Sequence, residues 1–262
     1  MISLLQLSDT HIGSKKNGFN AEKNLQRAIR HALSMQIQWD GLILTGDLVE
    51  SGSVDDYETL KDLLQPILKQ VPVYFCLGNH DSRDNFKNVF KTFWDQHVAE
   101  KGSWLQYSIG LGNQHQLIVI DSLSEGFDQG HLCTERLDWL RAKLNEYQNQ
   151  KIIVAIHHPP FIFGNSLFDA MAIEERDQFA DILIQHPNID RVLCGHLHRT
   201  MTAQIGHCPI FSSPSTLHAY GVDYSHTHRS GIFDEGAGFA FHQWLPEQGW
   251  ISHSIVFMSP ND

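Results

Sequence analysis

The sequence predicts an α/β (α+β) fold in one domain of 262 residues. Three observations support this prediction. Short apolar runs alternate with amphipathic segments over the first 200 residues, as strands that alternate with helices do. Beyond that point the helical pattern stops and short strand patterns follow one another. Several of the apolar runs end in an aspartate, an asparagine or a histidine, which draws attention to one edge of the predicted sheet.

Short apolar runs predict the strands. The first run, which begins at Ile2, alternates little between apolar and polar residues, and this indicates a buried strand. Two later runs are separated by a turn around Gly110 and Gly112, so we expect a hairpin there. The predicted strands are Ile2 to Leu7, Gly41 to Leu44, Pro72 to Leu77, Trp104 to Ile109, Gln116 to Ile120, Ile152 to Ile156 and Arg191 to Cys194.

Apolar residues spaced three and four apart predict the helices. Ser53 or Asp55 is expected to cap the second helix, and Thr134 is expected to cap the fourth. A glycine-containing loop, Phe161 to Asp169, is expected before the last helix. The predicted helices are Asn20 to Gln38, the segment that ends near Leu68, Asn85 to His97, Glu135 to Tyr147 and Glu174 to Gln185.

The C-terminal part, from about residue 200, is predicted to be rich in β-structure. Its short strands suggest a meander that closes one sheet. No linker rich in proline, glycine or serine divides the chain, and no internal repeat appears, so residues 1–262 are assigned to one domain. The predicted C-terminal strands are Met201 to Ile205, Pro209 to Ser212, Gly236 to Trp244 and Trp250 to Phe257.

The composition argues against several classes of partner. The net charge is −11, from 30 acidic and 19 basic residues, and no cluster of lysine and arginine appears. Such a surface repels nucleic-acid backbones and anionic lipids, so we expect neither nucleic acid nor a membrane as a partner. The apolar runs are too short to span a bilayer, and the N-terminus does not resemble a secretion signal, which favours the cytoplasm. The 17 histidines are the unusual feature, because imidazole is the commonest metal ligand.

The four cysteines are scattered and form no C-x-x-C pair. Cys76 and Cys194 lie inside apolar runs, where buried thiols are expected rather than disulfides. A zinc site built on cysteine is therefore not expected.

Five of the predicted strands end in residues that can bind metal ions. The carboxyl ends of strands in α/β sheets gather ligands, so these residues are expected to meet in one crevice. In an extended chain residues i and i+2 point the same way, so the motifs Asp-x-His and His-x-His each present two ligands together. The strand-end residues are Asp9 with His11, Asp47, Asn79 with His80, His157 with His158, and His196 with His198.

These side chains suit a pair of metal ions. The mixture of oxygen and imidazole ligands without cysteine favours Mn, Fe or Zn at a higher coordination number than a structural zinc has. Seven ligands are too many for one ion, but they suit two ions that share a carboxylate, for which Asp47 is expected. Two ions about 3.5–4 Å apart can polarise a phosphoryl group, ionise a bridging water and stabilise the leaving oxygen.

Each of these residues also has an interpretation without metal. A single histidine is often only hydrogen-bonded in a core or at a surface. Asp9 and Asp81 are also typical of helix caps and turns, and Asn79 could occupy a left-handed turn after Gly78. The coincidence of five strand ends with metal-binding residue types favours the metal site over these alternatives.

Five short motifs spread over about 190 of the 262 residues resemble those of the calcineurin-like metallophosphoesterases. The Ser-Asp-Thr-His and His-His-Pro-Pro segments and Ser213 to Thr216 are similar to the class III cyclic-nucleotide phosphodiesterase branch. That branch includes bacterial cyclic AMP phosphodiesterases and glycerophosphodiesterases. The resemblance implies a sandwich of two mixed β-sheets flanked by helices. The motifs are Asp9-Thr10-His11, Gly46-Asp47, Gly78-Asn79-His80-Asp81, His157-His158-Pro159 and Gly195-His196-Leu197-His198.

The resemblance implies a role for each site residue. His80 would lie beside the phosphate, as a general acid or as a hydrogen-bond donor to the transition state. His157 rather than His158 would be a ligand. Glu50 stands where phosphatases of the family often have an aspartate that orients His80, so the partner of His80 is left open. The first metal would be held by Asp9, His11, His198 and Asp47, and the second by Asn79, His157, His196 and Asp47.

The resemblance also implies the reaction. A metal-bridging hydroxide would attack a small phosphodiester in line, with two divalent ions per chain, Fe or Mn in preference to Zn. The expected substrate is 3′,5′-cyclic AMP or a related cyclic nucleotide, because no inserted cap domain appears between Asp81 and His157. A glycerophosphodiester or a nucleotide pyrophosphate is the alternative substrate. A catalytically silent binding module on the same fold is a more remote alternative.

Substrate contacts are expected from the cluster and from two neighbouring segments. Phe161 to Met171 and residues 216–220 are well placed to line the cleft. Tyr220 or Phe161 could stack on a base, although packing roles are equally compatible. Relatives include dimers, so a homodimer is one alternative for the oligomeric state. The expected substrate-binding residues are His11, Asp47, Asn79, His80, His198 and, more weakly, His218.

Overall fold

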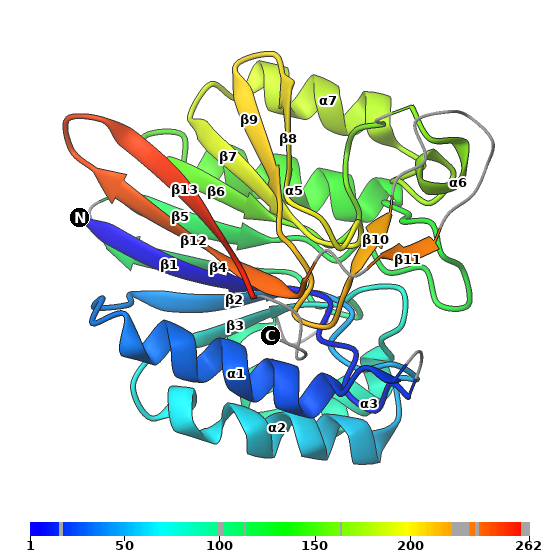
Figure 1. Ribbon diagram of the computed structural model, residues 1–262. Coiled ribbons are helices and arrows are strands. Elements are labelled where there is room, and N and C mark those ends of the chain that lie inside the picture. The colour runs from blue at the N-terminus through cyan, green and yellow to red at the C-terminus, as the bar shows by residue number, and fades with distance from the viewer. Residues whose placement is uncertain are drawn as a thin grey trace.

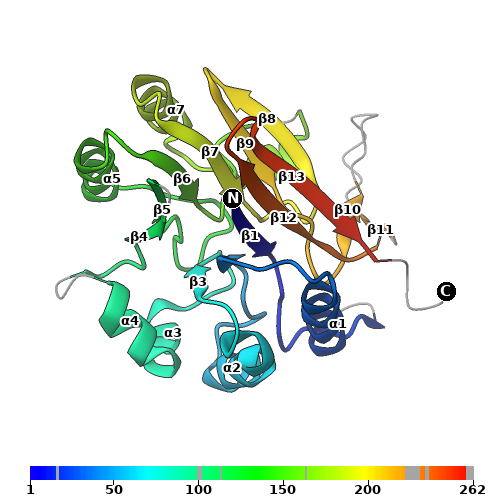
Figure 2. The ribbon, with the colours of Figure 1, turned by 90° about the vertical axis from the view of Figure 1, so that its left-hand side faces the viewer.

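Two mixed β-sheets lie face to face at the centre of the protein, and helices cover the outer face of each (Figures 1 and 2). The computed structural model describes residues 1–15, 18–98, 102–112, 114–162, 164–221, 231–233 and 236–257. The layers follow the order helix, sheet, sheet, helix. The predicted fold class, a sandwich of two mixed sheets flanked by helices, is confirmed.

The first sheet has the strand order β13-β12-β1-β2-β3. Its parallel strands are β1 (Ile2–Leu7), β2 (Gly41–Thr45) and β3 (Val73–Cys76). The strands β12 (Gly238–Leu245) and β13 (Gly249–Val256) are antiparallel to their neighbours. Every residue of β1 is buried, since this strand lies in the middle of the sheet between the two layers. The carboxyl ends of the three parallel strands therefore meet at one edge.

The second sheet has the strand order β4-β5-β6-β7-β9-β8. The inner strands are parallel, and the two edge strands are antiparallel to their neighbours. A separate two-stranded ladder joins β10 to β11. The bounds are β4 (Tyr107–Gly112), β5 (His115–Val119), β6 (Lys151–Ala155), β7 (Ile189–Cys194), β8 (Met201–Ile205), β9 (Cys208–Ser212), β10 (Ala219–Gly221) and β11 (Gly231–Phe233).

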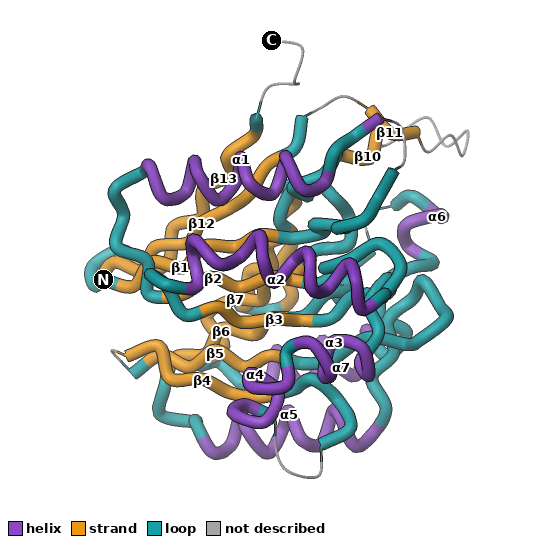
Figure 3. Tube along the Cα trace, turned by 90° about the horizontal axis from the view of Figure 1, so that it is seen from below, coloured by secondary structure: helices purple, strands orange, loops and turns teal. Residues whose placement is uncertain are grey.

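Helices α1 to α4 lie on the side of the first sheet, and α5 and α7 lie on the side of the second (Figure 2). Figure 3 shows α1 and α2 side by side in front of the strands. Asn20 and Ser53 cap these two helices, because each side chain accepts a hydrogen bond from a backbone N–H in the first turn. The bounds are α1 (Ala21–Ser34), α2 (Val54–Leu68), α3 (Arg83–Val89), α4 (Lys91–His97), α5 (Thr134–Glu146), α6 (Ser166–Asp169) and α7 (Arg176–Gln185).

Alternate residues of the second sheet belong to two different cores. Leu117 and Val119 pack in the core that the two sheets share. Ile118 and Ile120 pack instead with the apolar faces of α5 and α7. Because both faces of the sheet are covered, its inner strands consist of nearly continuous runs of apolar residues. Within the part of the chain that the structure describes, no helix is both long enough and apolar enough to cross a bilayer.

An ion pair ties the two sheets together at their carboxyl edge. Arg83, at the start of α3, donates to both carboxylate oxygens of Asp121, at 2.8 and 2.9 Å. Asp121 follows β5, is fully buried, and also accepts the backbone N–H groups of Leu105 and Leu123. A buried carboxylate with this many donors is strongly held. The loops that carry the site are thereby fixed relative to each other.

The prediction that the C-terminal strands close one sheet was wrong. Strands β8 and β9 extend the second sheet, whereas β12 and β13 extend the first. Both sheets bury the same kinds of apolar residue, so the pattern of a single strand does not reveal which sheet it joins. The ladder of β10 and β11 was not predicted. The assignment of residues 1–262 to one domain stays a prediction.

Element boundaries differ from prediction where the backbone turns locally. The helix predicted over residues 85–97 is two helices, because Phe90 has φ −99° and ψ 36°. The first helix stops at Ser34, just before Gln36, which has a φ of 55°. Cys133, not Thr134, occupies the N-cap of α5. The short helix α6 lies in the segment predicted as a loop. All four cysteines are free, and Cys76 and Cys194 are buried thiols, as predicted.

Candidate dinuclear metal site

The carboxyl ends of the parallel strands of both sheets lie on the same side of the molecule (Figure 1). A cluster of polar side chains lies at these strand ends. The structure brings all seven predicted ligands together there. Six of the seven are at most 6% exposed, and the asparagine is half-buried. The residues are Asp9 and His11 after β1, Asp47 after β2, Asn79 after β3, His157 after β6, and His196 and His198 after β7.

Five of these seven residues have a left-handed backbone conformation. L-residues with a side chain rarely adopt it, and such strain is concentrated at functional sites. The pairing of ligands in Asp-x-His and His-x-His was attributed to an extended backbone, and this explanation was wrong. The two ligands of each motif nevertheless lie together. Sharp turns after the strands aim these side chains at one place. The φ angles are 51° at Asp9, 43° at His11, 47° at Asp47, 70° at His196 and 52° at His198.

Close packing explains the glycines that precede two of the ligands. A Cβ atom on Gly78 would lie 2.3 Å from Oδ1 of Asp47. A Cβ atom on Gly46 would lie 2.2 Å from Nδ1 of His157, and Gly46 also has a φ of 92°. Neither position can accept a side chain while the cluster keeps its geometry.

Three of the histidines have one ring nitrogen fixed by an acceptor outside the cluster. Carbonyl and carboxylate oxygens only accept hydrogen bonds, so Nδ1 carries the hydrogen in each neutral ring. The lone pair on Nε2 is then directed into the cluster, as it is in metal-binding histidines. The Nδ1 contacts are His11 to the Glu50 carboxylate at 2.9 Å, His157 to the Thr45 carbonyl at 2.7 Å, and His198 to the His218 carbonyl at 3.2 Å.

The nitrogen atoms left for the cluster face one another and face oxygen atoms. Nε2 of His11 lies 3.1 Å from Nε2 of His198. Nε2 of His157 lies 3.2 Å from Nδ1 of His196 and 3.2 Å from Oδ1 of Asn79. Lone pairs at these distances repel unless a proton or a cation lies between them. Imidazole, carboxylate and amide donors without cysteine fit divalent ions such as Mn, Fe or Zn.

The ligand atoms form two groups, and Asp47 connects them. Its Oδ2 lies 3.5 Å from Nε2 of His11, and its Oδ1 lies 3.5 Å from Nε2 of His157. One carboxylate oxygen is thus directed to each group, as the prediction of a shared ligand requires. The first group is Asp9, His11, Asp47 and His198, and the second is His157, His158 and His196; within each group the ligand atoms lie within 4.8 Å of one another.

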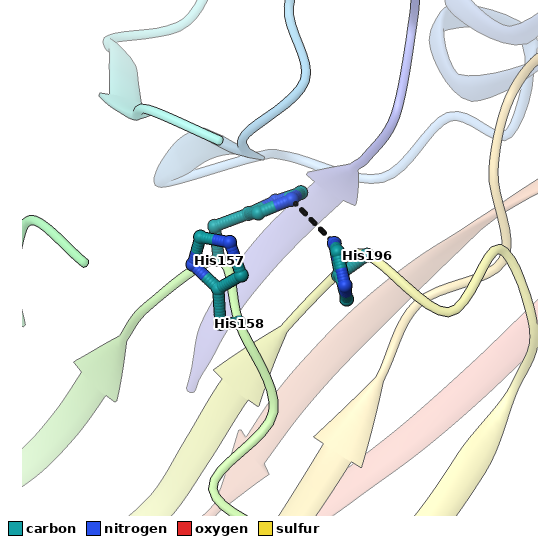
Figure 4. A group of neighbouring side chains, drawn as sticks. All are labelled: His157, His158 and His196. Carbon is teal, nitrogen blue, oxygen red and sulfur yellow. Dashed lines mark hydrogen bonds between the residues drawn. The ribbon is translucent and has the colours of Figure 1, made fainter. Parts of the chain in front are cut away.

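His158 differs from its neighbour in what it contacts. Figure 4 shows the rings of His157, His158 and His196 close together, with the contact between His157 and His196 dashed. Nδ1 of His158 lies 2.8 Å from Oγ of Ser122. His157, in contrast, faces Asp47. This geometry favours His157 over His158 as the ligand, an assignment that stays a prediction.

Burial and mutual charge shift the pKa values of the cluster. Burial raises the pKa of Asp9 to about 6, against the opposing charge of His157. For His157 the carboxylate of Asp47 outweighs burial and raises the pKa to about 9. Burial acts to raise the pKa of Asp47, but His157 holds it well below its usual range. A metal ion that binds His157 must therefore displace a proton that the ring holds at neutral pH.

His80 lies beside the cluster with its ring against that of His11, at 4.7 Å between centroids. Its backbone N–H donates to Oδ1 of Asp47 at 2.9 Å, and its Nδ1 lies 2.8 Å from the carbonyl oxygen of Glu50. The partner that the sequence left open is thus the backbone carbonyl of Glu50 and not its carboxylate. The carboxylate contacts His11 instead.

Asp81 has the turn role that the sequence offered as an alternative. Its carboxylate accepts the backbone N–H groups of Gly78 at 2.8 Å and Leu48 at 3.2 Å, and the hydroxyl of Tyr57 at 2.8 Å. It is 5% exposed, and burial raises its pKa to about 6. Asp81 therefore holds the loops after β2 and β3 together beneath the cluster.

A pocket of about 230 Å³ opens beside the cluster. Tyr220 packs against His198 with 4.3 Å between ring centroids, and against Phe168 with 5.6 Å. The predicted segment from Phe161 to Met171 contributes to this lining through α6 and its neighbours. The lining residues are Asp47, Asn79, His80, His196 and His198 from the cluster, and Asp128, Leu167, Phe168, Met171 and Tyr220 around it.

Two residues that were predicted to contact substrate lie outside the pocket lining, and one residue of the lining was not predicted. His218 is 4% exposed and lies against His198, outside the pocket lining, so its contact with substrate stays a prediction. Phe161 is likewise outside that lining. Asp128 lines the pocket from a loop without a recognisable motif, and no sequence signal could have found it.

A two-sheet sandwich with paired clusters of histidine and aspartate at its carboxyl edge defines a metallohydrolase of the phosphoesterase type. Residues 2–200 match the family model of the calcineurin-like phosphoesterases, and the chain belongs to this family. The resemblance found in the sequence motifs is thereby confirmed.

Several known proteins are similar to this chain over most of its length. A probable glycerophosphodiester phosphodiesterase, GpdQ of Arcobacter nitrofigilis, is 30% identical over 257 residues, which are 96% of this chain and 92% of the relative. The 3′,5′-cyclic adenosine monophosphate phosphodiesterase CpdA of Pseudomonas aeruginosa is 27% identical over 219 residues, 82% and 76% of the two chains. The crystal structure of a dimetal phosphatase from Danio rerio superposes with a TM-score of 0.70 at 12% identity, covering 98% and 99%, which shows a common fold.

Proposed function

We propose that the protein is a dinuclear-metal phosphodiesterase whose preferred substrate is 3′,5′-cyclic AMP or a related cyclic nucleotide. The observation that carries the proposal is the convergence of imidazole nitrogen atoms and carboxylate oxygen atoms on two adjacent positions beside a pocket that His80 lines. Two divalent ions held there would supply Lewis acidity and an activated water. The proposed ligands are Asp9, His11 and His198 at one position, Asn79, His157 and His196 at the other, and Asp47 at both.

His80 is assigned the proton transfer to the leaving oxygen. Its Nδ1 donates to the carbonyl of Glu50, so Nε2 is the atom available to a substrate. Nε2 bears a hydrogen only in the imidazolium form, because Nδ1 already carries the hydrogen of the neutral ring. As the P–O bond breaks, that proton passes from Nε2 to the leaving alkoxide, and the hydrogen bond to Glu50 persists.

The composition of the pocket supports a nucleoside as the rest of the substrate. Phe168 and Tyr220 offer aromatic surface, and Leu167 and Met171 are apolar, which suits a planar base. Asp128 can accept hydrogen bonds from an exocyclic amino group or a ribose hydroxyl. Among the described residues that line the pocket there is no lysine or arginine. The further phosphate of a nucleotide pyrophosphate would therefore lack a side-chain cation.

A glycerophosphodiester is the second candidate substrate. Similarity to the GpdQ relative extends over 96% of this chain, against 82% for the CpdA relative. A glycerol group is small and polar, so it would leave the aromatic wall of Phe168 and Tyr220 without a partner. For this reason we place it second.

A substrate panel tests the proposal. The manganese-loaded protein is assayed with cyclic AMP, glycerophosphocholine and bis(p-nitrophenyl) phosphate, and we expect the highest kcat/KM with cyclic AMP. A higher kcat/KM with glycerophosphocholine would favour the second candidate. Turnover of none of the three would favour a catalytically silent binding module. A Tyr220→Ala variant should raise KM for cyclic AMP more than for bis(p-nitrophenyl) phosphate, because stacking on the base is lost.

The remaining expectations belong to the same proposal. We infer Fe or Mn in preference to Zn as the native ions, and metal analysis of protein purified without chelators tests this inference. The net charge of −11 supports an enzyme that acts on small molecules and not on nucleic acid. A cytoplasmic location and a homodimer are proposed on the sequence alone, and size-exclusion chromatography with light scattering tests the second.

A further inference from the structure

We propose that the carboxylate of Glu50 is a positioning residue, which holds His11 in the tautomer and orientation that bind a metal ion. The inference rests on the proposed metal site and goes beyond it, because Glu50 is not one of the seven ligands. Its Oε2 lies 2.9 Å from Nδ1 of His11, and the two side chains are 18% and 4% exposed. The carboxylate keeps the hydrogen on Nδ1 and leaves Nε2 to the metal.

The backbone of Glu50 is fixed on both sides. Its N–H donates to the carbonyl oxygen of Ile12 at 2.9 Å, and its own carbonyl oxygen lies 2.8 Å from Nδ1 of His80. Ile12 and Val49 form an isolated parallel bridge next to these contacts. The side chain of Glu50 therefore starts from a fixed point beside the segment that carries His11.

From this fixed backbone the length of the side chain decides which histidine it reaches. An aspartate would be shorter by one C–C bond, about 1.5 Å. The contact of 2.9 Å to His11 would then lengthen beyond hydrogen-bonding distance. His80 does not need the side chain, because the backbone carbonyl already fixes its ring. One residue thus orients two histidines, His80 through its backbone and His11 through its carboxylate.

The charge of this partner sets His11 apart from the other two histidines with a fixed Nδ1. His157 and His198 have neutral carbonyl partners, whereas His11 has a carboxylate. A negative partner stabilises the positive charge that an imidazole gains when it binds a cation, and so makes it a stronger ligand. Loss of such a partner typically weakens metal binding by about 10–100-fold. We expect that loss at the position that contains Asp9, His11 and His198.

Four variants test the role of Glu50 by direct measurement of Mn²⁺ binding with isothermal titration calorimetry. Glu50→Ala removes the carboxylate, Glu50→Asp keeps the charge but not the reach, and Glu50→Gln keeps the reach but not the charge. The matched control is Glu58→Ala, which removes one acidic group that is 54% exposed on α2. The kcat of each variant at saturating Mn²⁺ is the second readout, and urea unfolding establishes that each variant is folded.

We expect the Kd of one of the two Mn²⁺ ions to rise by about 10–100-fold in Glu50→Ala and Glu50→Asp, by less in Glu50→Gln, and not at all in Glu58→Ala. Saturating Mn²⁺ should restore kcat in Glu50→Ala, because the carbonyl that orients His80 is retained.

Unchanged Mn²⁺ affinity in Glu50→Ala would overturn the proposal. Wild-type affinity in Glu50→Asp would refute the argument from length. A wild-type protein that fails to bind two ions would instead refute the proposed site itself. If Glu50→Ala does not fold, the other two variants still separate reach from charge.

Discussion

Two regions of this molecule that contain buried histidines differ in how their hydrogen bonds are completed. One region lies between the two sheets, where His242 of β12 contacts Gln6 of β1. The other is the cluster around Asp47 at the strand ends. His242 and Gln6 are fully buried and Asp47 is 2% exposed, so both regions are removed from solvent. Burial alone therefore does not separate a structural histidine from a candidate ligand.

In the region between the sheets each contact joins a donor to an acceptor. The amide nitrogen of Gln6 donates to the hydroxyl of Thr45 at 2.9 Å and to the carbonyl of Cys194 at 3.0 Å. Oε1 of Gln6 accepts from Nε2 of His242 at 2.9 Å, and Nδ1 of His242 accepts from the hydroxyl of Ser252 at 2.8 Å. A neutral His242 thus has both ring nitrogens paired within the protein.

At the strand ends, in contrast, some acceptor atoms have no donor, and their lone pairs face one another. Nε2 of His11 and Nε2 of His198 are 3.1 Å apart, and neither carries a hydrogen when both rings are neutral. The direction of the unpaired lone pairs, more than the number of histidines, marks the site.

The largest effect is expected from Asp47→Asn, because Asp47 is the ligand directed at both groups. The amide keeps one oxygen but removes the negative charge, so one position loses its oxygen ligand and the other keeps only a neutral one. We expect Mn²⁺ content and kcat/KM to fall together, by more than the roughly 10–100-fold that loss of a supporting residue costs. Elemental analysis and kinetics measure the two quantities. An Asp47→Asn protein that keeps two ions per chain would show that Asp47 is not the shared ligand.

His80→Ala is expected to separate chemistry from metal binding. The side chain lines the pocket. The backbone N–H, which alanine retains, donates to Oδ1 of Asp47. We therefore expect wild-type Mn²⁺ content and a kcat lowered by roughly 10²–10⁴-fold, the contribution typical of a general acid. Unchanged kcat would remove His80 from the mechanism. The loss should be smaller for bis(p-nitrophenyl) phosphate, whose leaving group needs little protonation.

Much of this site could be predicted because the chemistry lies at the ends of strands that apolar runs reveal. Gly-Asp after residues 41–44 and Gly-His after residues 191–194 follow runs that the structure confirms as β2 and β7. The parallel arrangement of the inner strands then brings these ends to one edge. The left-handed backbone of His196 and His198 could not be predicted, because such conformations depend on the surrounding structure that over-determines them.

The hydrogen-bond partners of the histidines could not be predicted from the sequence either. Glu50 stands at a position that resembles the aspartate position of phosphatases of the family, yet its side chain contacts His11 and its carbonyl contacts His80. A choice between two neighbouring rings depends on distances of an ångström or two. Asp128 and the ladder of β10 with β11 come from segments whose short or irregular pattern carries little information.

A smaller effect, confined to stability, is expected from His242→Leu in the region between the sheets. The change leaves Oε1 of the fully buried Gln6 without this partner, whereas the half-buried hydroxyl of Ser252 keeps its contact with Arg191. We expect the free energy of unfolding to fall by about 1–3 kcal/mol, the usual cost of a stranded polar group. Mn²⁺ affinity should stay at the wild-type value, and urea unfolding with calorimetry measures both. Loss of metal from this variant would mean that the two regions are not independent.

The smallest effect is the dependence of that stability difference on pH. Burial, followed by the positive charges of Arg191 on β7 and of His253 on β13, holds the pKa of His242 well below its usual range in the folded protein. In the unfolded chain the ring titrates near 6.5. Below that pH the unfolded chain binds a proton that the folded protein does not, so the contribution of His242 to stability decreases as the pH falls. It is complete above that pH.

The stability difference between the wild type and His242→Leu should therefore shrink between pH 7.5 and pH 5, by up to about 1.4 kcal/mol per pH unit below 6.5. Urea unfolding of both proteins with a chelator present measures it, because the histidines at the strand ends then contribute equally to the two curves and cancel in the difference. A stability difference that stays constant over this range would mean that folded His242 accepts a proton. In that case the hydrogen bond to Ser252 would reverse its direction, and Nη1 of Arg191, 3.3 Å from Nδ1 of His242, would face a second donor, because both nitrogen atoms of a protonated ring donate.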